Sequence, residues 1–167
     1  MTDKIPVTLT VNGQRHALLI EPRRTLVDAL REDCHLTGTH TGCEHGVCGA
    51  CTIIADGRAI RACLIFAVQA QDMDLRTVEG LAGEGLANST ALHPLQRAFS
   101  EHHALQCGYC TPGFLMLAAA TLQQTPDITE DALIDVLSSN LCRCTGYKNI
   151  LAAVKSAAAE MRAGAPA

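Results

Sequence analysis

Cysteine is the residue type in this chain whose number and spacing could do chemistry. Nine cysteines occur among 167 residues. Eight of them form two groups of four, one group in each half of the chain: Cys43, Cys48, Cys51 and Cys63, then Cys107, Cys110, Cys142 and Cys144. Four thiolates in one place can bind a metal ion or an iron–sulfur cluster, and paired thiols can do redox chemistry.

The first group has the spacing Cys43-x4-Cys48-x2-Cys51, with Cys63 following at a distance. This is the plant-type [2Fe–2S] spacing. Each iron needs two thiolates beside its bridging sulfides, so a loop that supplies three ligands must wrap around the cluster. Three glycines are expected to take positive φ there and to bring backbone N–H groups close to sulfur: Gly42, Gly46 and Gly49.

Other metal centres fit the first group less well. The bacterial cluster motif needs a cysteine where Ile54 stands, and a Rieske centre needs two histidine ligands, of which Cys43-x-His45 supplies one. Four thiolates also suit structural zinc, which remains an alternative. The spacing favours iron and sulfide over zinc.

The second group pairs Cys107-x2-Cys110 with Cys142-x-Cys144. Cys110 stands just before Thr111, where a helix is expected to begin, so a cluster there would lie near the positive end of that helix. The spacing alone permits a cluster, a zinc ion or a redox disulfide between Cys107 and Cys110. The first group favours the cluster, because two neighbouring clusters form a path for electrons.

The first half reads as a small α+β domain of the β-grasp kind. Val7, Leu9 and Val11 alternate with polar residues, and Asn12-Gly13 predicts a hairpin turn into a second strand ending near Ile20. Thr25 to Asp28 is a capping-box pattern that predicts a helix. Further strands are expected over 51–55, 58–63 and 74–78.

The second half reads as a four-helix bundle. Helices are expected over 95–102, from a Thr111 cap with Pro112 at the first helical position to about 124, from Thr129, and over 149–162. The predicted domains are 1–78, which binds the plant-type cluster, and 90–167, which binds the second cluster. Residues 79–89 are the predicted linker.

Composition excludes several functions. With 13 Lys+Arg against 17 Asp+Glu, no basic cluster, 3% aromatic residues and no Trp, a nucleic-acid role is disfavoured. The longest apolar run, 114–122, is far shorter than the roughly 18 residues of a membrane span. No secretory signal pattern is present, so a cytoplasmic location is expected, where grouped cysteines indicate metal or redox chemistry.

The remaining chemical side chains have simpler interpretations. Cys34, the ninth cysteine, is expected to be a small half-buried residue rather than a redox sensor. His40 and His45 flank the first cysteine loop and are expected to be exposed, although they could tune a cluster. Arg143, between two thiolates, either offsets cluster charge or is a surface residue.

Three motifs resemble the iron–sulfur small subunits of molybdenum hydroxylases, the family of xanthine oxidase and aerobic carbon monoxide dehydrogenase. They are Gly42-Cys-Glu-His-Gly-Val-Cys-Gly-Ala-Cys-Thr52, Gln106-Cys-Gly-Tyr-Cys-Thr-Pro-Gly113 and Asn140-Leu-Cys-Arg-Cys-Thr-Gly-Tyr147. The resemblance implies a ferredoxin-like domain and a helical domain, each holding one [2Fe–2S] cluster. It also implies that the second group of cysteines receives electrons from molybdenum and the first passes them on.

By the same resemblance, Gln106 contacts a molybdopterin held by a separate large subunit. An FAD-containing medium subunit or a cytochrome is then the expected acceptor, and this chain has no catalytic residue of its own. The chain is therefore expected to be the electron-transfer subunit of an oxidoreductase. A free-standing two-cluster ferredoxin and a structural zinc protein are the alternatives.

Overall fold

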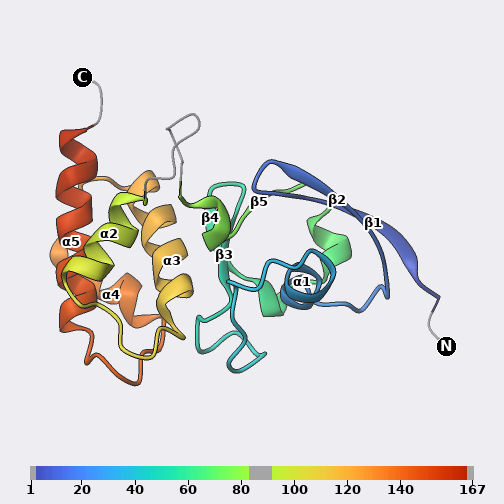
Figure 1. Cartoon of the computed structure of the whole chain (residues 1–167), viewed down its shortest axis with the longest axis horizontal. Helices are drawn as coiled ribbons and strands as arrows, with labels where there is room; N and C mark the ends of the chain where they lie inside the picture. Colours follow the sequence, from blue (N-terminus) through green and yellow to red (C-terminus); the bar gives the residue numbers. More distant parts are fainter. Residues whose placement is uncertain (1–2, 83–91, 165–167) are drawn as a thin grey trace.

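The computed structural model describes residues 3–82 and 92–164. A sheet half and a helical half lie side by side (Figure 1). The strands are β1 (Ile5–Val11), β2 (Gln14–Ile20), β3 (Thr52–Ala55), β4 (Arg58–Arg61) and β5 (Asp74–Arg76). The helices are α1 (Leu26–Asp28), α2 (Pro94–Glu101), α3 (Thr111–Gln124), α4 (Glu130–Ser138) and α5 (Lys148–Ala163). These elements confirm the α+β class.

The sheet has the order β2-β1-β5-β3-β4. Its two hairpins form where the sequence predicts them, because Asn12-Gly13 and Asp56-Gly57 all take positive φ, from 48° to 75°, as a type I′ turn requires. β1 and β5 pair in parallel, and the other pairs are antiparallel. The last strand is shorter than expected, because a 3₁₀ turn replaces it at Val78–Gly80.

The first helix is held at its start by the predicted cap. The Thr25 hydroxyl accepts a hydrogen bond from the Asp28 amide at 3.2 Å and donates one to the Asp28 carboxylate at 2.6 Å. After one turn the backbone widens into a π-helical segment, Ala29–Asp33. The helix buries Leu26, Val27 and Leu30 against the sheet, as its pattern predicts.

Strand β3 joins the two halves because it is buried on both faces. Ile53 packs in the core of the sheet half, whereas the next residue, Ile54, packs in the core of the helical half. Helix α3 lies against β3 and β4, and Gln124, at the end of α3, donates a hydrogen bond to the Gly57 carbonyl at 2.6 Å. β3 begins one residue after Cys51, and α3 begins one residue after Cys110. Packing β3 against α3 therefore brings the two cysteine groups towards each other.

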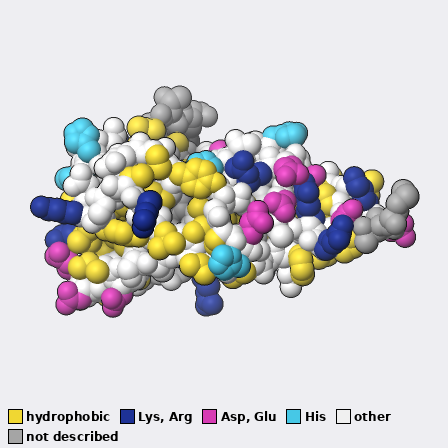
Figure 2. All heavy atoms as spheres, turned by 90° about the horizontal axis from the view of Figure 1, so that it is seen from below, with side chains coloured by type: hydrophobic (Ala, Val, Ile, Leu, Met, Phe, Trp, Pro, Cys, Tyr) yellow, Lys and Arg dark blue, Asp and Glu magenta, His cyan; other side chains and the backbone are white. Residues whose placement is uncertain are grey.

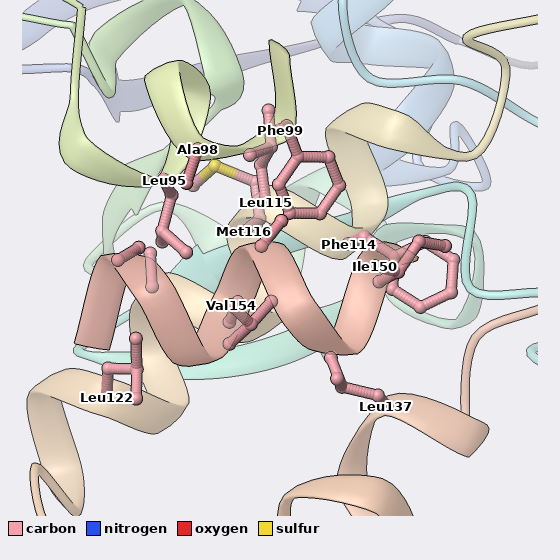
Figure 3. Packing of buried hydrophobic residues seen from close by; sticks show 14 of the residues in the cluster. Leu95, Ala98, Phe99, Phe114, Leu115, Met116, Leu122, Leu137, Ile150 and Val154 are labelled. Carbon is pink, nitrogen blue, oxygen red and sulfur yellow. The ribbon is translucent and has the colours of Figure 1, made fainter. Parts of the chain in front are cut away.

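The helical half surrounds a second apolar core, shown in Figure 3. The Thr129 hydroxyl caps α4 as predicted, and Ile150 and Val154 of α5 are buried. The predicted cap of α3 is wrong by one residue: Cys110 is the N-cap, and Thr111 is already helical. The cap is Cys110 because its carbonyl accepts the first hydrogen bond of the helix, from the Phe114 amide at 3.1 Å.

Two further sequence expectations concern the connection and the membrane. Most of the predicted linker, from residue 83 onwards, lies outside the described residues. Within the described ranges, none of the helices combines the length and the hydrophobicity needed to cross a bilayer.

Candidate iron–sulfur centres

The first group of cysteines is assembled by a loop and a hairpin. Cys43 and Cys48 lie half-buried in the loop that precedes β3, and Cys51, at the end of that loop, is 2% exposed. The β3–β4 hairpin then returns the chain, and the Ala62 amide donates to the Cys51 carbonyl at 3.2 Å. Cys63 follows directly. The hairpin therefore places the fourth thiol beside the third, as the sequence predicts.

The backbone of this loop points N–H groups at sulfur. The Cys48 amide donates to the Cys43 sulfur at 3.3 Å. Gly46 and Gly49 take the predicted positive φ, at 85° and 75°, whereas Gly42 does not, and Glu44 does, at 58°. Gly42 is constrained by space instead, because a Cβ there would lie 3.0 Å from the Cys48 sulfur.

Burial and hydrogen bonding shift the pKa values of the thiols in this group in opposite directions. Hydrogen bonds from the Cys48 and His45 backbone lower the pKa of Cys43 to about 6. Burial raises the pKa of Cys51 to about 12. A thiol must lose its proton to bind metal. Cys43 is therefore prepared as a thiolate, whereas Cys51 gives up its proton when a metal provides the compensating charge.

The second group is assembled from two turns of the helical half. Cys107 and Cys110 lie in the turn before α3, and Cys142 and Cys144 lie in the turn between α4 and α5. The sulfur atoms of Cys107 and Cys144 are 3.5 Å apart. The Cys110 and Cys142 thiols lie close enough to act on each other's pKa. All four thiols of the helical half therefore meet, as the sequence predicts.

The thiols of the second group also differ in the direction of their pKa shifts. Burial raises the pKa of Cys110 to about 12. Burial acts in the same direction on Cys142, but hydrogen bonds from the Thr145 hydroxyl and amide outweigh it and lower the pKa. A hydrogen bond from the Tyr109 backbone lowers the pKa of Cys107. As in the first group, the pKa values within the set are shifted in opposite directions.

The donor set of each group is four thiols. Four thiolates can hold a [2Fe–2S] cluster, two for each iron, and they can also hold one zinc ion. Across residues 3–82 and 92–164, no group of three or more His, Cys, Asp or Glu side chains is arranged to hold a single metal ion. The chemistry of the donors therefore fits a cluster in each half without excluding zinc.

Four other residues that were singled out from the sequence differ in burial and in contacts. Cys34 is buried in the sheet core, and burial raises its pKa to about 11. The ring of His45 is hydrogen-bonded to the Cys43 carbonyl. Arg143 is exposed. Gln106 is exposed as well, and its side-chain amide donates to the Cys144 carbonyl at 3.2 Å.

Contacts between the two loops were missed by sequence reasoning. The Leu141 amide donates to the Cys48 carbonyl at 2.9 Å, which links the two ligand segments directly. His40 stacks on Tyr109, with ring centroids 4.7 Å apart, and its Nδ1 lies 2.8 Å from the Tyr109 carbonyl. The Tyr109 hydroxyl donates in return to the Thr41 carbonyl.

Asn140 and Tyr147 were also missed. The Asn140 side chain donates to the Gly49 carbonyl at 3.3 Å. The Tyr147 hydroxyl donates to the Asn140 carbonyl at 3.0 Å and accepts from the Cys142 amide at 2.9 Å. Both residues belong to the third resemblance motif. Their place at its two ends was the one signal that could have singled them out.

Comparisons with known proteins agree with this geometry. The family model described as a 2Fe-2S iron-sulfur cluster binding domain matches residues 9–82, and the [2Fe-2S] binding domain model matches residues 77–155. The protein is thus a two-cluster protein, with one [2Fe–2S] domain model over each cysteine group.

Curated relatives and solved structures match almost the whole chain. It is 51% identical to the nicotine 6-hydroxylase small subunit of Paenarthrobacter nicotinovorans, over 93% of this chain and 91% of the relative. It is 52% identical to the caffeine dehydrogenase subunit gamma of Pseudomonas sp. (strain CBB1), over 90% and 89%. The structure of quinoline 2-oxidoreductase from Pseudomonas putida 86 superposes with a TM-score of 0.88 at 45% identity, covering 97% of this chain and 98% of that one. With both cysteine groups assembled and these matches spanning both halves, the chain belongs to the family of iron–sulfur small subunits of molybdenum hydroxylases.

Proposed function

We propose that the eight grouped cysteines hold the two [2Fe–2S] clusters and that the chain conducts electrons from a molybdopterin site on a large subunit to a separate acceptor. The ligands of the first cluster are Cys43, Cys48, Cys51 and Cys63, and those of the second are Cys107, Cys110, Cys142 and Cys144. The observation that carries this proposal is the hydrogen bond from the Leu141 amide to the Cys48 carbonyl, because it connects one ligand loop to the other.

The chain's own residues supply the connection. When bound, [2Fe–2S] clusters supply one-electron redox chemistry. Leu141 is bonded covalently to Cys142, and the carbonyl it binds belongs to Cys48 itself. A path from one ligand to the other therefore crosses peptide bonds and a single 2.9 Å hydrogen bond, without a gap through space.

We assign the thiols to four pairs, one for each iron. In the helical half, the Cys107 and Cys144 sulfur atoms are 3.5 Å apart, and we pair Cys110 with Cys142 because each thiol acts on the pKa of the other. In the sheet half, we pair Cys51 with Cys63, whose thiol acts on the Cys51 pKa, and Cys43 with Cys48, whose amide donates to the Cys43 sulfur at 3.3 Å. Each iron of a [2Fe–2S] cluster takes two protein thiolates, which these pairs supply.

The helical-half cluster is assigned to the side of the large subunit. Leu105, Tyr109 and Leu141 are apolar or aromatic, 40–53% exposed, and lie in the turns that carry this cysteine group. Figure 2 views the side of the molecule that bears these turns, and hydrophobic side chains gather over its helical half. Exposed apolar patches of this kind mark protein interfaces. Gln106 lies in the same turns and is exposed, and we assign to it the contact with the pterin.

The sheet-half cluster is assigned to the side of the acceptor. Val47, Leu64 and Phe66 are 47–62% exposed, and Leu64 packs against the backbone of Gly46 inside the first ligand loop. These residues offer a second apolar surface beside the other end of the path. The acceptor would be an FAD-containing medium subunit or a cytochrome. No residue of this chain is assigned a catalytic role.

We assign the two cluster-binding domains to 1–78 and 90–167, joined by 79–89. The fold supports this division, because the sheet half is complete by β5 and the helical half begins with α2. A cytoplasmic location is part of the same proposal, since a reducing compartment keeps cysteines available for metal binding.

A metal count on the tagged protein, purified from its native host, tests this proposal. We expect about four Fe per chain, two for each cluster, with about one Mo and a co-purified large subunit. Four Fe on a monomeric chain that never co-purifies with Mo would instead identify a free-standing ferredoxin. Zinc in place of iron would overturn the proposal.

A further inference from the structure

The two ligand loops meet at two consecutive residues on each side. Asn140 donates through its side-chain amide to the Gly49 carbonyl at 3.3 Å, and the next residue, Leu141, donates through its backbone amide to the Cys48 carbonyl at 2.9 Å. These residues are about ninety positions apart in the chain. The two bonds together fix both the distance and the orientation of one loop relative to the other, which a single bond could not do.

The Asn140 side chain is buried and lies directly against Gly49. Asn140 is 1% exposed. A Cβ on Gly49 would lie 2.1 Å from the Asn140 amide oxygen, and a Cβ on Gly113 would lie 2.3 Å from the Gly49 carbonyl oxygen. Gly49 is therefore enclosed between Asn140 and the first turn of α3.

The orientation of the Asn140 amide is set by its nitrogen. Among the described residues, its buried oxygen has no hydrogen-bond donor. Leaving a buried acceptor unpaired costs free energy. The bond from the nitrogen to Gly49 is thus the polar contact that the buried side chain does make, which is what a positional role requires.

The same residue is tied to a ligand of the second cysteine group. The Tyr147 hydroxyl donates to the Asn140 carbonyl and accepts from the Cys142 amide, at 3.0 and 2.9 Å. Asn140 therefore contacts the first ligand loop through its side chain and is linked through Tyr147 to the backbone of Cys142 in the second.

We propose that Asn140 is a positioning residue for electron transfer between the two clusters: its side chain holds the Gly49 carbonyl, so that Cys48 and Leu141 stay hydrogen-bonded. The inference rests on the proposed function, which assigns the clusters and the path between them. It adds that one buried amide contributes to the spacing of the two clusters, beside the contacts of Tyr109 with His40 and Thr41 and the close approach of Gly113 to Gly49.

The test compares Asn140→Ala and Asn140→Ser with a matched control in the purified holoenzyme complex. The control is Gln124→Ala, because Gln124 also donates a side-chain amide to a glycine carbonyl of the sheet half, at 2.6 Å, but from the far end of α3. If Asn140→Ala lowers the iron content, the measurements are made on Asn140→Ser instead, because serine keeps a small polar side chain at this position.

Three measurements distinguish a variant that has lost the positioning of the clusters from one that has failed to fold. Hydrogen exchange of peptides that cover 139–145 reports the Leu141 bond without reference to activity. The EPR spectrum of the fully reduced complex reports the magnetic interaction between the clusters. Rapid freeze-quench after substrate addition reports how fast reducing equivalents move from the helical-half cluster to the sheet-half cluster.

We expect the Asn140 variants to keep their iron, to exchange faster over 139–145 and to lose part of the magnetic interaction. Transfer between the clusters should slow severalfold, because the rate of electron transfer falls steeply as the distance between two redox centres grows. Gln124→Ala should match the wild type in all three. An unchanged spectrum and transfer rate in iron-replete Asn140 variants would overturn the inference, as would equal effects in Gln124→Ala. Failure of the proposed function would show in the wild type instead, where substrate would reduce neither cluster.

Discussion

Replacing Gly113 by Ala tests the close approach of the two halves. Gly113 is the third residue of α3 and is buried. Its added Cβ would lie 2.3 Å from the Gly49 carbonyl oxygen, 3.2 Å from the Gly49 carbonyl carbon and 3.3 Å from the Ala50 Cα. All three are backbone atoms, so no flexible side chain can move aside. The nearest contact must open by about 1 Å to reach ordinary van der Waals distance.

Two effects of opposite sign act on this variant. Exchanging Gly for Ala inside a helix stabilises by about 1 kcal/mol. Overpacking a well-packed interior costs about 1–3 kcal/mol, and a clash with rigid backbone belongs at the upper end of that range. We therefore expect a net destabilisation of about 2 kcal/mol, which lowers the unfolding temperature by roughly 4–8 °C for a chain of this size.

The assay is thermal unfolding of the purified complex, followed by the loss of visible iron–sulfur absorbance. Gly164→Ala is the matched control. Gly164 is the C-cap of α5, and a Cβ added there would lie 3.6 Å from the Glu160 carbonyl oxygen, which is an ordinary van der Waals contact. The control should be unchanged or slightly more stable. If Gly113→Ala unfolds at or above the wild-type temperature, the gain in helix propensity outweighs the clash, and the two halves are not closely packed at Gly113.

Three other predictions follow from single side chains. Cys110→Ser should leave the first cluster in place, reduce the iron content from about four to about two per chain, and stop electron delivery from molybdenum to the acceptor. Tyr147→Phe should destabilise the complex by about 1 kcal/mol in thermal unfolding, because it leaves the part-buried Cys142 amide and Asn140 carbonyl without their shared partner. For Cys34, burial raises the folded pKa from 9.0 to about 11. The stability contributed by its neutral thiol is therefore present below pH 9 and lost as pH rises towards 11, and Cys34→Ala should show a shallower loss of unfolding temperature over that range.

Each of these has a result that would count against it. Full turnover with the natural acceptor in Cys110→Ser would mean that electrons bypass the helical half. Wild-type stability in Tyr147→Phe would show that water or backbone movement replaces the hydroxyl. A Cys34→Ala variant with the same alkaline profile as the wild type, or with less iron, would show that Cys34 ionises freely or takes part in metal binding.

Local signals in the sequence predicted local structure well. The alternation of β1, the Asn12-Gly13 turn and the Thr25 cap each depend on residues within a few positions of one another, and all three are present. The grouping of the cysteines was also predictable, because the ligand spacing of an iron–sulfur loop is a short-range pattern in the sequence.

Contacts between distant segments were not predictable in the same way. The Asn140–Gly49 bond and the His40–Tyr109 stack join residues that are 91 and 69 positions apart, and they exist only because α3 packs on β3. The cap of α3 was misplaced for a related reason. Thr111 has the right residue type, but the Cys110 carbonyl, in the turn that gathers the cysteines, already accepts the first helical hydrogen bond from Phe114.

The distribution of the two thiol sets along the chain shows what each half contains without the other. The β3–β4 hairpin completes the first set within the sheet half, and the turns before α3 and after α4 complete the second within the helical half. Neither set takes a thiol from the other half. The contacts of Gly49, Gly113 and Asn140 therefore join two complete sets of four thiols and do not complete either one.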